Sequence, residues 1–471
     1  MRVPRHAWLR GVQRRVLWTF SIPRLIMASK NPAHELLRAA PIRPAGQEGD
    51  DSKCDAGNES FDDQRQTEDR PRPYQWSTST RTDALAEPAG SVGELCVVAT
   101  IANLREIEQV YGETTALAVR HAVYERARAL SRSGRATVAT TGAHIVFIFD
   151  LSCLSYKGNA SEELCGPIVE HRIVKVLGAH AVPLGDAAIM PVVRASAMRS
   201  GYQPFQDFID AANLATAGHH WCERYRADMV VAAAVFAALE EKRLDFDREP
   251  VCAAGDSQDV TYYEVLLCEI RNGQRIRIGG LVGAVERLGM VRRLDEWVVD
   301  STIAALRRNP ALRLGCNVSA HSATLDAWWT PIASQLHADR RLASRLTIEI
   351  TETVAMTSTT EARNFVRTFQ ALGCQIALDD LGKGYNNLIA LIGLGVDIVK
   401  IDLRCLRQEG GTRSPLGLRP LIQFAKAYAA SVIVEGIETE DDAQQARECG
   451  ATCLQGYLYS GPSPNVGAER G

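Results

Sequence analysis

The sequence has little net charge and no clustered cysteine pairs, and each shortage excludes a class of protein. Its 53 lysine and arginine residues nearly balance 56 aspartate and glutamate residues over 471 positions, for a formal net charge of −3. That balance argues against a protein whose main task is to grip a nucleic acid polymer through its phosphates. The 12 cysteines are scattered and form no Cys-x-x-Cys pair. A disulfide scaffold or a zinc ribbon is therefore disfavoured, and a reducing, cytoplasmic compartment fits better.

Long apolar runs are also lacking, because none approaches the ~20 residues that a helix needs to cross a bilayer. We therefore expect no transmembrane segment. Residues 1–30 hold seven basic side chains and no acidic one. Such a stretch is typical of a disordered tail, or of a start codon placed too early with Met27 as the true start. A segment lying on an anionic membrane surface, or a targeting address, is the alternative.

Residues 46–70 reverse the charge, with nine acidic residues against three basic ones. They offer almost nothing apolar to bury, so ordering them would cost conformational entropy without a compensating gain. We expect residues 1–90 to form a disordered N-terminal region, basic at first and then acidic.

Residues 91–240 follow an α+β pattern without a catalytic constellation. The hydrophobic periodicity predicts strands at 95–100, 138–141 and 145–149, the last two as a hairpin, and helices at 113–131 and 205–217. Paired carboxylates, a phosphate-binding loop and metal-spaced histidines are all missing from this part of the sequence. Residue chemistry alone therefore indicates a sensor, dimerisation or spacer domain.

Residues 243–465 alternate short apolar strands with helical stretches. The eight expected strands cover residues 249–252, 262–267, 314–318, 346–350, 376–380, 398–401, 432–435 and 453–458. Eight strands separated by helices predict an α/β fold, a closed (β/α)8 TIM-type barrel.

Side-chain alternation along these strands turns polar residues toward the barrel interior, near the C-terminal strand ends. The inward set is Glu264, Asn317, Glu349, Asp379, Lys400, Glu435 and Gln455. With Glu352 and Asp380 close by, the carboxylates repel each other unless cations neutralise them. An all-oxygen ligand set favours Mg²⁺ or Mn²⁺ over zinc. Two such cations beside a lysine are what phosphodiester hydrolysis requires.

Each part of this pattern also has a plainer interpretation. Asp379 and Asp380 fit an ordinary turn, and Lys400 with Asp402 fits an ion pair inside the barrel. Glu438 fits the start of a helix, where an acidic side chain interacts favourably with the helix dipole. The occurrence of all of them on successive strand ends favours the metal site.

The same residues resemble the EAL domain of cyclic di-GMP phosphodiesterases over about 249–464. Glu264-Val-Leu-Leu stands where that family has Glu-Ala-Leu-Leu. The further matching segments, in family order, are Asn317-Val-Ser, Glu349-Ile-Thr-Glu352, Asp379-Asp-Leu-Gly-Lys-Gly-Tyr385, Val399-Lys-Ile-Asp402, Glu435-Gly-Ile-Glu-Thr439 and Leu454-Gln-Gly-Tyr-Leu458.

The resemblance implies hydrolysis of cyclic di-GMP to linear pGpG with two divalent cations, Mg²⁺ or Mn²⁺. It implies that the cation ligands are Glu264, Asn317, Glu349, Asp379 and Asp380. Lys400 and Glu435 would adjoin the reacting water, with Glu435 as general base, and Glu352 would anchor the loop after Asp380. Glu438 and Gln455 would complete the surroundings. Cyclic di-GMP is the expected ligand, with a homodimer through the barrel and signalling proteins as further expected partners.

Two departures from the family pattern bear on the substrate. Cys268 stands where the family usually has an arginine that contacts a substrate phosphate, and Glu249 replaces a glutamine that would face the ligand. A thiol cannot replace a bidentate guanidinium contact. The alternative function is therefore a catalytically weak or inactive cyclic di-GMP receptor or protein-interaction module.

Residues 91–240 resemble, more faintly, a diguanylate cyclase (GGDEF) domain that has lost its catalytic residues. Thr100 occupies the usual metal-aspartate position, and the name-giving turn reads Thr141-Gly-Ala-His-Ile145. No carboxylate remains there to hold Mg²⁺, so the resemblance implies a degenerate regulatory or dimerising domain without cyclase activity.

Overall fold

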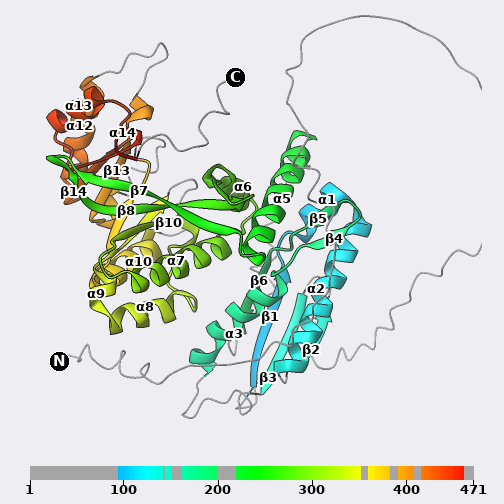
Figure 1. Ribbon diagram of the computed structural model, residues 1–471. Helices are drawn as coiled ribbons and strands as arrows, with labels where there is room; N and C mark the ends of the chain where they lie inside the picture. Colours follow the sequence, from blue (N-terminus) through cyan, green and yellow to red (C-terminus); the bar gives the residue numbers. More distant parts are fainter. Residues whose placement is uncertain are drawn as a thin grey trace, which may run out of the picture. The chain divides into compact units, whose positions relative to one another are not determined.

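A computed structural model of the chain describes residues 94–134, 136–141, 144–150, 162–198, 219–351, 359–381, 391–406 and 415–460 (Figure 1). The N-terminal region expected to be disordered and the helix expected at 205–217 lie outside these residues. Among the helices of the described ranges, none combines the length and the apolar character that a membrane span requires.

The first part of the described chain is an antiparallel sheet packed with helices. Its four strands have the order β2-β3-β1-β6. The bounds are β1 Glu94–Ile101, β2 Ala136–Thr141, β3 His144–Asp150 and β6 Val193–Ala197, with a separate pair of β4 Val182–Leu184 and β5 Ala187–Ile189. The helices are α1 Leu104–Tyr111, α2 Glu113–Gly134, α3 Glu162–Leu177 and α5 His219–Glu240.

The residues that the hydrophobic periodicity places on one face of a helix form part of the core here. Ala116, Val119, Val123 and Ala127 of α2 are buried, as their three- and four-residue spacing on one helix face predicts. The hairpin of β2 and β3 and the strand β1 lie where they are expected, and Thr100 pairs with His144 across β1 and β3. The hydroxyl of Thr100 lies 2.7 Å from Nδ1 of His144.

The second part is a closed barrel. In its nine-stranded sheet, the order runs β10-β11-β12-β13-β14-β15-β7-β8-β9, and β8 also pairs with β10, which closes eight strands into a ring. Their bounds are β7 Leu244–Ala253, β8 Asp256–Arg271, β10 Leu314–Ser319, β11 Leu346–Thr351, β12 Gln375–Leu378, β13 Ile398–Asp402, β14 Ser431–Glu435 and β15 Cys453–Gln455. The additional strand, β9 Gln274–Arg277, extends only β8.

Helices connect the parallel strands of this barrel (Figure 1). They are α6 Val282–Arg287, α7 Val291–Arg308, α8 Trp329–Ala338, α9 Arg340–Ala343, α10 Thr359–Leu372, α12 Pro415–Lys426, α13 Glu440–Cys449 and α14 Tyr457–Ser460. Short 3-10 turns are η5 Gly279–Leu281, η6 Ala320–Ser322 and η7 Leu403–Leu406.

The strand prediction needs several corrections. β7 and β8 are not separated by a helix but form an antiparallel hairpin, because the turn around Gly255 is too short for the crossover that parallel strands need. The strand expected at 453–458 ends at Gln455, and α14 begins at Tyr457. The strand expected at 376–380 also ends early, at Leu378, and β7 and β8 extend well beyond the expected 249–252 and 262–267. The other four strands match the prediction to within one or two residues.

The alternation rule is confirmed by two separate apolar clusters. Val399, Ile401, Val432 and Val434 belong to the large core between the sheet and the helices. Ile433 belongs instead to a small cluster with Val251, Tyr262, Ala377, Ile398 and Cys453. Along β13 and β14, residues therefore alternate between the outer core and the barrel interior, and Lys400 and Glu435 share the interior side.

Candidate active site

Lys400 is the centre of the polar barrel interior. Its side chain is fully buried, and its Nζ lies 2.8 Å from Glu264 Oε2, 2.5 Å from Glu349 Oε2 and 2.6 Å from Glu435 Oε1. Asp379 Oδ1 is farther away, at 3.8 Å. These residues come from β8, β11, β13, β14 and the end of β12, so the barrel itself brings together carboxylates that are distant in sequence.

Two amides complete the surroundings of Glu264. Asn317 Nδ2 donates to Glu264 Oε1 at 2.6 Å, and Gln455 Nε2 donates to Glu264 Oε2 at 2.6 Å. Burial favours the neutral form of Glu264, but the Lys400 ammonium and these donors outweigh it and leave the pKa of this carboxyl lowered. Glu264 is therefore held as an anion.

The other carboxyls are held less firmly as anions. Burial, only partly opposed by Lys400, raises the pKa of Glu349 to about 8 and that of Asp379 to about 6. Burial also raises the pKa of Glu435 well above its usual range, with Asp379 and Glu264 adding to the effect. The pKa of Lys400 is raised despite its burial, because Asp379, Glu264, Glu349 and Glu435 surround it. One ammonium does not neutralise this cluster, so more positive charge is needed for all its carboxyls to ionise.

The free oxygens of the site fit divalent cations. Asn317 Oδ1, Glu349 Oε1 and Gln455 Oε1 are buried without a hydrogen-bond partner among the described residues. A buried unpaired acceptor is costly, and a hard cation is a natural partner for it. Asp379, Asp380 and Glu435 each offer a ligand oxygen, all within 4.8 Å of one another. The residues present therefore fit the Mg²⁺ or Mn²⁺ that the acidic pattern predicts.

The backbone is specialised at two positions beside these ligands. Asp380 has a φ of 58°, in the left-handed region that non-glycine residues seldom adopt and that clusters at functional sites. Gly315, opposite Glu264 in the sheet, cannot carry a side chain, because a Cβ there would collide with the Glu349 carboxylate and the Tyr262 ring. The close approach of β10 to the side chains of Glu349 and Tyr262 thus depends on glycine at position 315.

The other predicted site residues lie in different surroundings. Glu352 is outside the described residues. Glu438 is exposed just before α13, and its backbone N–H donates to Asp442. Glu249 is buried and accepts from Gln455 Nε2 at 3.4 Å. Cys268 has no exposed surface, so its thiol is closed to direct contact with a ligand in this arrangement.

Sequence reasoning missed two arginines at this end of the barrel. Arg277 of β9 lies directly across from Cys268, and its guanidinium is fully engaged by Asp247 and Glu249. Arg404 follows β13, with Nε and Nη2 bonded to the buried Asp402 and a side chain 62% exposed. The pairing of Arg277 depends on strands about 30 residues apart, for which the order of the sequence gives no signal. Arg404 pairs with Asp402 only two residues earlier, and this local Asp-x-Arg spacing could have indicated it.

The comparisons with known proteins can now be set against this geometry. The EAL domain family model matches residues 232–462. The barrel matches this family model over its whole length. The matching segment includes the Lys400 cluster and every predicted site residue, among them the predicted ligands from Glu264 to Asp380.

Two relatives of the barrel sequence have the name cyclic di-GMP phosphodiesterase. The chain is 29% identical to the cyclic di-GMP phosphodiesterase PdeF of Escherichia coli, over 49% of this chain and 31% of that protein. It is 38% identical to the cyclic di-GMP phosphodiesterase TpdA of Vibrio parahaemolyticus, over 26% of this chain and 22% of that protein. The matched segments thus span about a third or less of these relatives.

Solved EAL domains also align with the chain. One is the FimX EAL domain of Pseudomonas aeruginosa bound to c-di-GMP, at 27% identity and a TM-score of 0.43, with 50% of this chain and 96% of that chain covered.

Proposed function

We propose that this EAL domain hydrolyses one phosphodiester bond of cyclic di-GMP to give linear pGpG. The observation that carries the proposal is the buried Lys400 among four carboxylates, with unpaired ligand oxygens beside it. Such a site is expensive to bury unless cations and an anionic reactant complete it. The names of the relatives PdeF and TpdA supply the substrate.

Five side chains are assigned as ligands of two divalent cations, Mg²⁺ or Mn²⁺: Glu264, Asn317, Glu349, Asp379 and Asp380. Bound there, the cations would supply an activated water and stabilise charge on the phosphoryl oxygens. Glu435, with its raised pKa, accepts the proton of the attacking water as a P–O ester bond breaks. Lys400 holds the carboxylates in place and offsets developing negative charge.

The remaining residues have supporting roles in this proposal. Glu352 would anchor the loop that follows Asp380. Gln455 orients Glu264, and Glu438, Cys268 and Glu249 complete the substrate end of the barrel. We further propose that residues 1–90 are a linker-like region, that 91–240 form a degenerate GGDEF-like regulatory domain, and that 243–465 form the EAL domain. We also propose that the protein forms a homodimer through the barrel, that it interacts with signalling proteins, and that it is located in the cytoplasm.

A second candidate function is a cyclic di-GMP receptor with weak or no turnover. One observation favours it: Cys268 is closed off, and the guanidinium opposite it is already engaged by Asp247 and Glu249. A substrate phosphate therefore finds no free guanidinium at this position. Under this candidate function the cations and the nucleotide would bind, but no product would form.

The test is incubation of the full chain with cyclic di-GMP and Mg²⁺ or Mn²⁺, followed by chromatographic separation of the nucleotides. We expect pGpG with either cation and none in excess EDTA. Glu264→Gln and Asp379→Asn should abolish turnover, whereas Glu448→Gln and Asp441→Asn, which alter exposed carboxylates on α13, should not. Wild-type activity in either site variant would show that the ligand assignment is wrong. Binding without product in the wild type would favour the receptor.

A further inference from the structure

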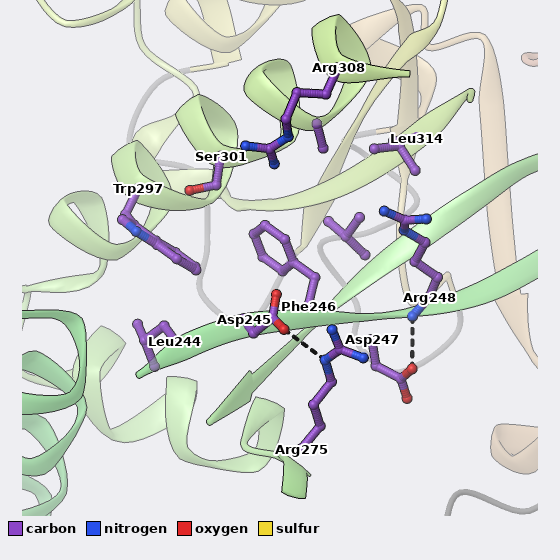
Figure 2. Close-up of a pocket in the computed structure, with 12 residues that line it drawn as sticks. Leu244, Asp245, Phe246, Asp247, Arg248, Arg275, Trp297, Ser301, Arg308 and Leu314 are labelled. Carbon is purple, nitrogen blue, oxygen red and sulfur yellow. Dashed lines mark hydrogen bonds and ion pairs between the residues drawn. The ribbon is translucent and has the colours of Figure 1, made fainter. Parts of the chain in front are cut away.

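A cavity of about 460 Å³ lies between α7 and the β7–β8 strands (Figure 2). Its lining contains no residue of the Lys400 cluster. Val265 lines it, and this residue is next to Glu264 on β8 but belongs to the core outside the barrel. The cavity therefore lies on the outer side of the strand whose inner side carries the proposed active site.

Two arginines from different elements point into this cavity. Figure 2 shows Arg308 extending from α7 toward the space above the Phe246 ring and Arg248 extending from β7 toward Leu314, and both arginines line the cavity. Neither guanidinium has a hydrogen bond or an ion pair with any described residue. By contrast, the neighbouring Arg307 is bonded to Gln335. An exposed arginine is ordinary by itself, but two that converge on one cavity form a site for an anion.

The carboxylates at the cavity do not neutralise this pair. Asp245 accepts from Arg275 Nε at 2.7 Å, and Asp247 accepts from Arg277 at 2.8 and 2.9 Å. Each acid of the lining is thus paired with an arginine other than Arg248 and Arg308. The charge left over in the cavity is positive.

The floor of the cavity is aromatic. The ring centroids of Phe246 and Trp297 are 5.1 Å apart with planes inclined at 40°, and both rings are partly exposed. Partly exposed rings of this kind accommodate a flat ligand ring by stacking or edge contact. The Ser301 hydroxyl lies at the same wall and adds a donor or acceptor (Figure 2).

We propose that this cavity binds a small molecule that combines a phosphate with a flat ring, such as a mononucleotide. Arg248 and Arg308 would hold the phosphate, and Phe246 and Trp297 would contact the ring. The volume falls in the range of small-molecule sites, roughly 300–1,000 Å³. This inference does not depend on the proposed hydrolysis, because it uses the opposite side of β8 and needs no metal.

The experiment is calorimetric titration of the full chain with GMP in excess EDTA, so that the proposed metal site cannot capture the phosphate. Guanosine and inorganic phosphate are titrated separately. We expect GMP to bind more tightly than either fragment. Arg248→Ala and Arg308→Ala should each weaken GMP binding roughly tenfold, since each removes a charge-assisted contact. Arg307→Ala is the matched control on α7 and should leave the affinity unchanged.

Several results would overturn the proposal. If GMP does not bind at millimolar concentration, the cavity is not a binding site for a mononucleotide. If guanosine binds as tightly as GMP, the arginines do not contribute to binding. If inorganic phosphate binds as tightly as GMP, the rings do not contribute. Equal losses of GMP affinity in Arg307→Ala and Arg308→Ala would indicate that the positive surface attracts the nucleotide without a specific site. The variants Arg248→Gln and Arg308→Gln serve as controls for folding. If their melting temperatures equal that of the wild type, a loss of GMP affinity is a loss of binding and not of folding.

Discussion

Removal of the Lys400 ammonium is the perturbation that the structure predicts most sharply. Lys400→Met keeps the length of the buried side chain but removes the only cation bonded directly to Glu264, Glu349 and Glu435 in the described structure. The three carboxylates that lie within 2.8 Å of Nζ would together lose the positive charge that they share. They cannot turn to water, because Glu349 is fully buried and Glu264 nearly so.

The expected cost follows from this burial. Removing one partner of a buried ion pair costs about 3–5 kcal/mol, because a charge is left uncompensated. Protonation of the carboxyls limits the loss. Because Lys400 lowers the pKa of Glu349, its removal should raise that pKa further, and the variant should lose stability as the pH rises. The difference between variant and wild type should shrink as the pH falls, since neutral carboxyls no longer need the ammonium.

The assay is urea denaturation of both proteins in EDTA and in Mg²⁺, at low and high pH, with Lys426→Met as the control at an exposed lysine of α12. Mg²⁺ should stabilise Lys400→Met more than it stabilises the wild type, because cations replace the lost positive charge and ligand binding to the folded state shifts unfolding. A Lys400→Met protein as stable as the wild type in EDTA at high pH would refute the reasoning.

Two further predictions concern residues outside this cluster. Burial raises the pKa of Asp295 from its ordinary 3.8 to about 7, so its contribution to stability is fully present below the ordinary value and is lost as the pH rises to about 7. Asp295→Asn should therefore lose less stability than the wild type between about pH 4 and about pH 7, measured by thermal unfolding. Arg404 Nη1 has no hydrogen bond to any residue that the structure describes, so Arg404→Ala should raise the KM for cyclic di-GMP roughly tenfold with little change in kcat, whereas Arg404→Lys recovers part of the loss. An unchanged KM with a lower melting temperature would mean that Arg404 only supports Asp402.

The inward side chains were predictable because successive residues of a regular strand point to opposite faces. Val399 and Ile401 are apolar on both sides of Lys400, and the same holds for Val432 and Val434 around Ile433. That pattern is enough to place Lys400 and Glu435 on the interior, and the structure brings them within 2.6 Å. The family motifs then predict which interior residues are ligands.

Pairings between strands were not predictable in the same way. The β7–β8 hairpin replaces an expected crossover, and its extension by β9 places Arg277 opposite Cys268. Local hydrophobic periodicity carries no information on which strand lies beside which. The link between two departures from the family pattern therefore stayed hidden: Glu249, in place of glutamine, bonds to the arginine that faces Cys268, in place of arginine.

The left-handed backbone of Asp380 was likewise beyond the sequence, because only aspartate and asparagine among larger residues adopt it with any frequency, and they do so in many turns. The Asp379-Asp380 pair therefore fitted a plain turn equally well. In the folded chain, Asp379, Asp380 and Glu435 each offer an oxygen within 4.8 Å of the others, which favours the proposed metal site over a plain turn.

Hydrolysis in ¹⁸O-labelled water tests the central claim most directly. The full chain is incubated with cyclic di-GMP and Mg²⁺ in this solvent, and the product is analysed by mass spectrometry. If the barrel directs water onto a phosphodiester, pGpG forms with a single ¹⁸O in its terminal phosphate, and Glu264→Gln gives none. A wild-type chain that binds the nucleotide and the cation yet releases no labelled pGpG would contradict the claim.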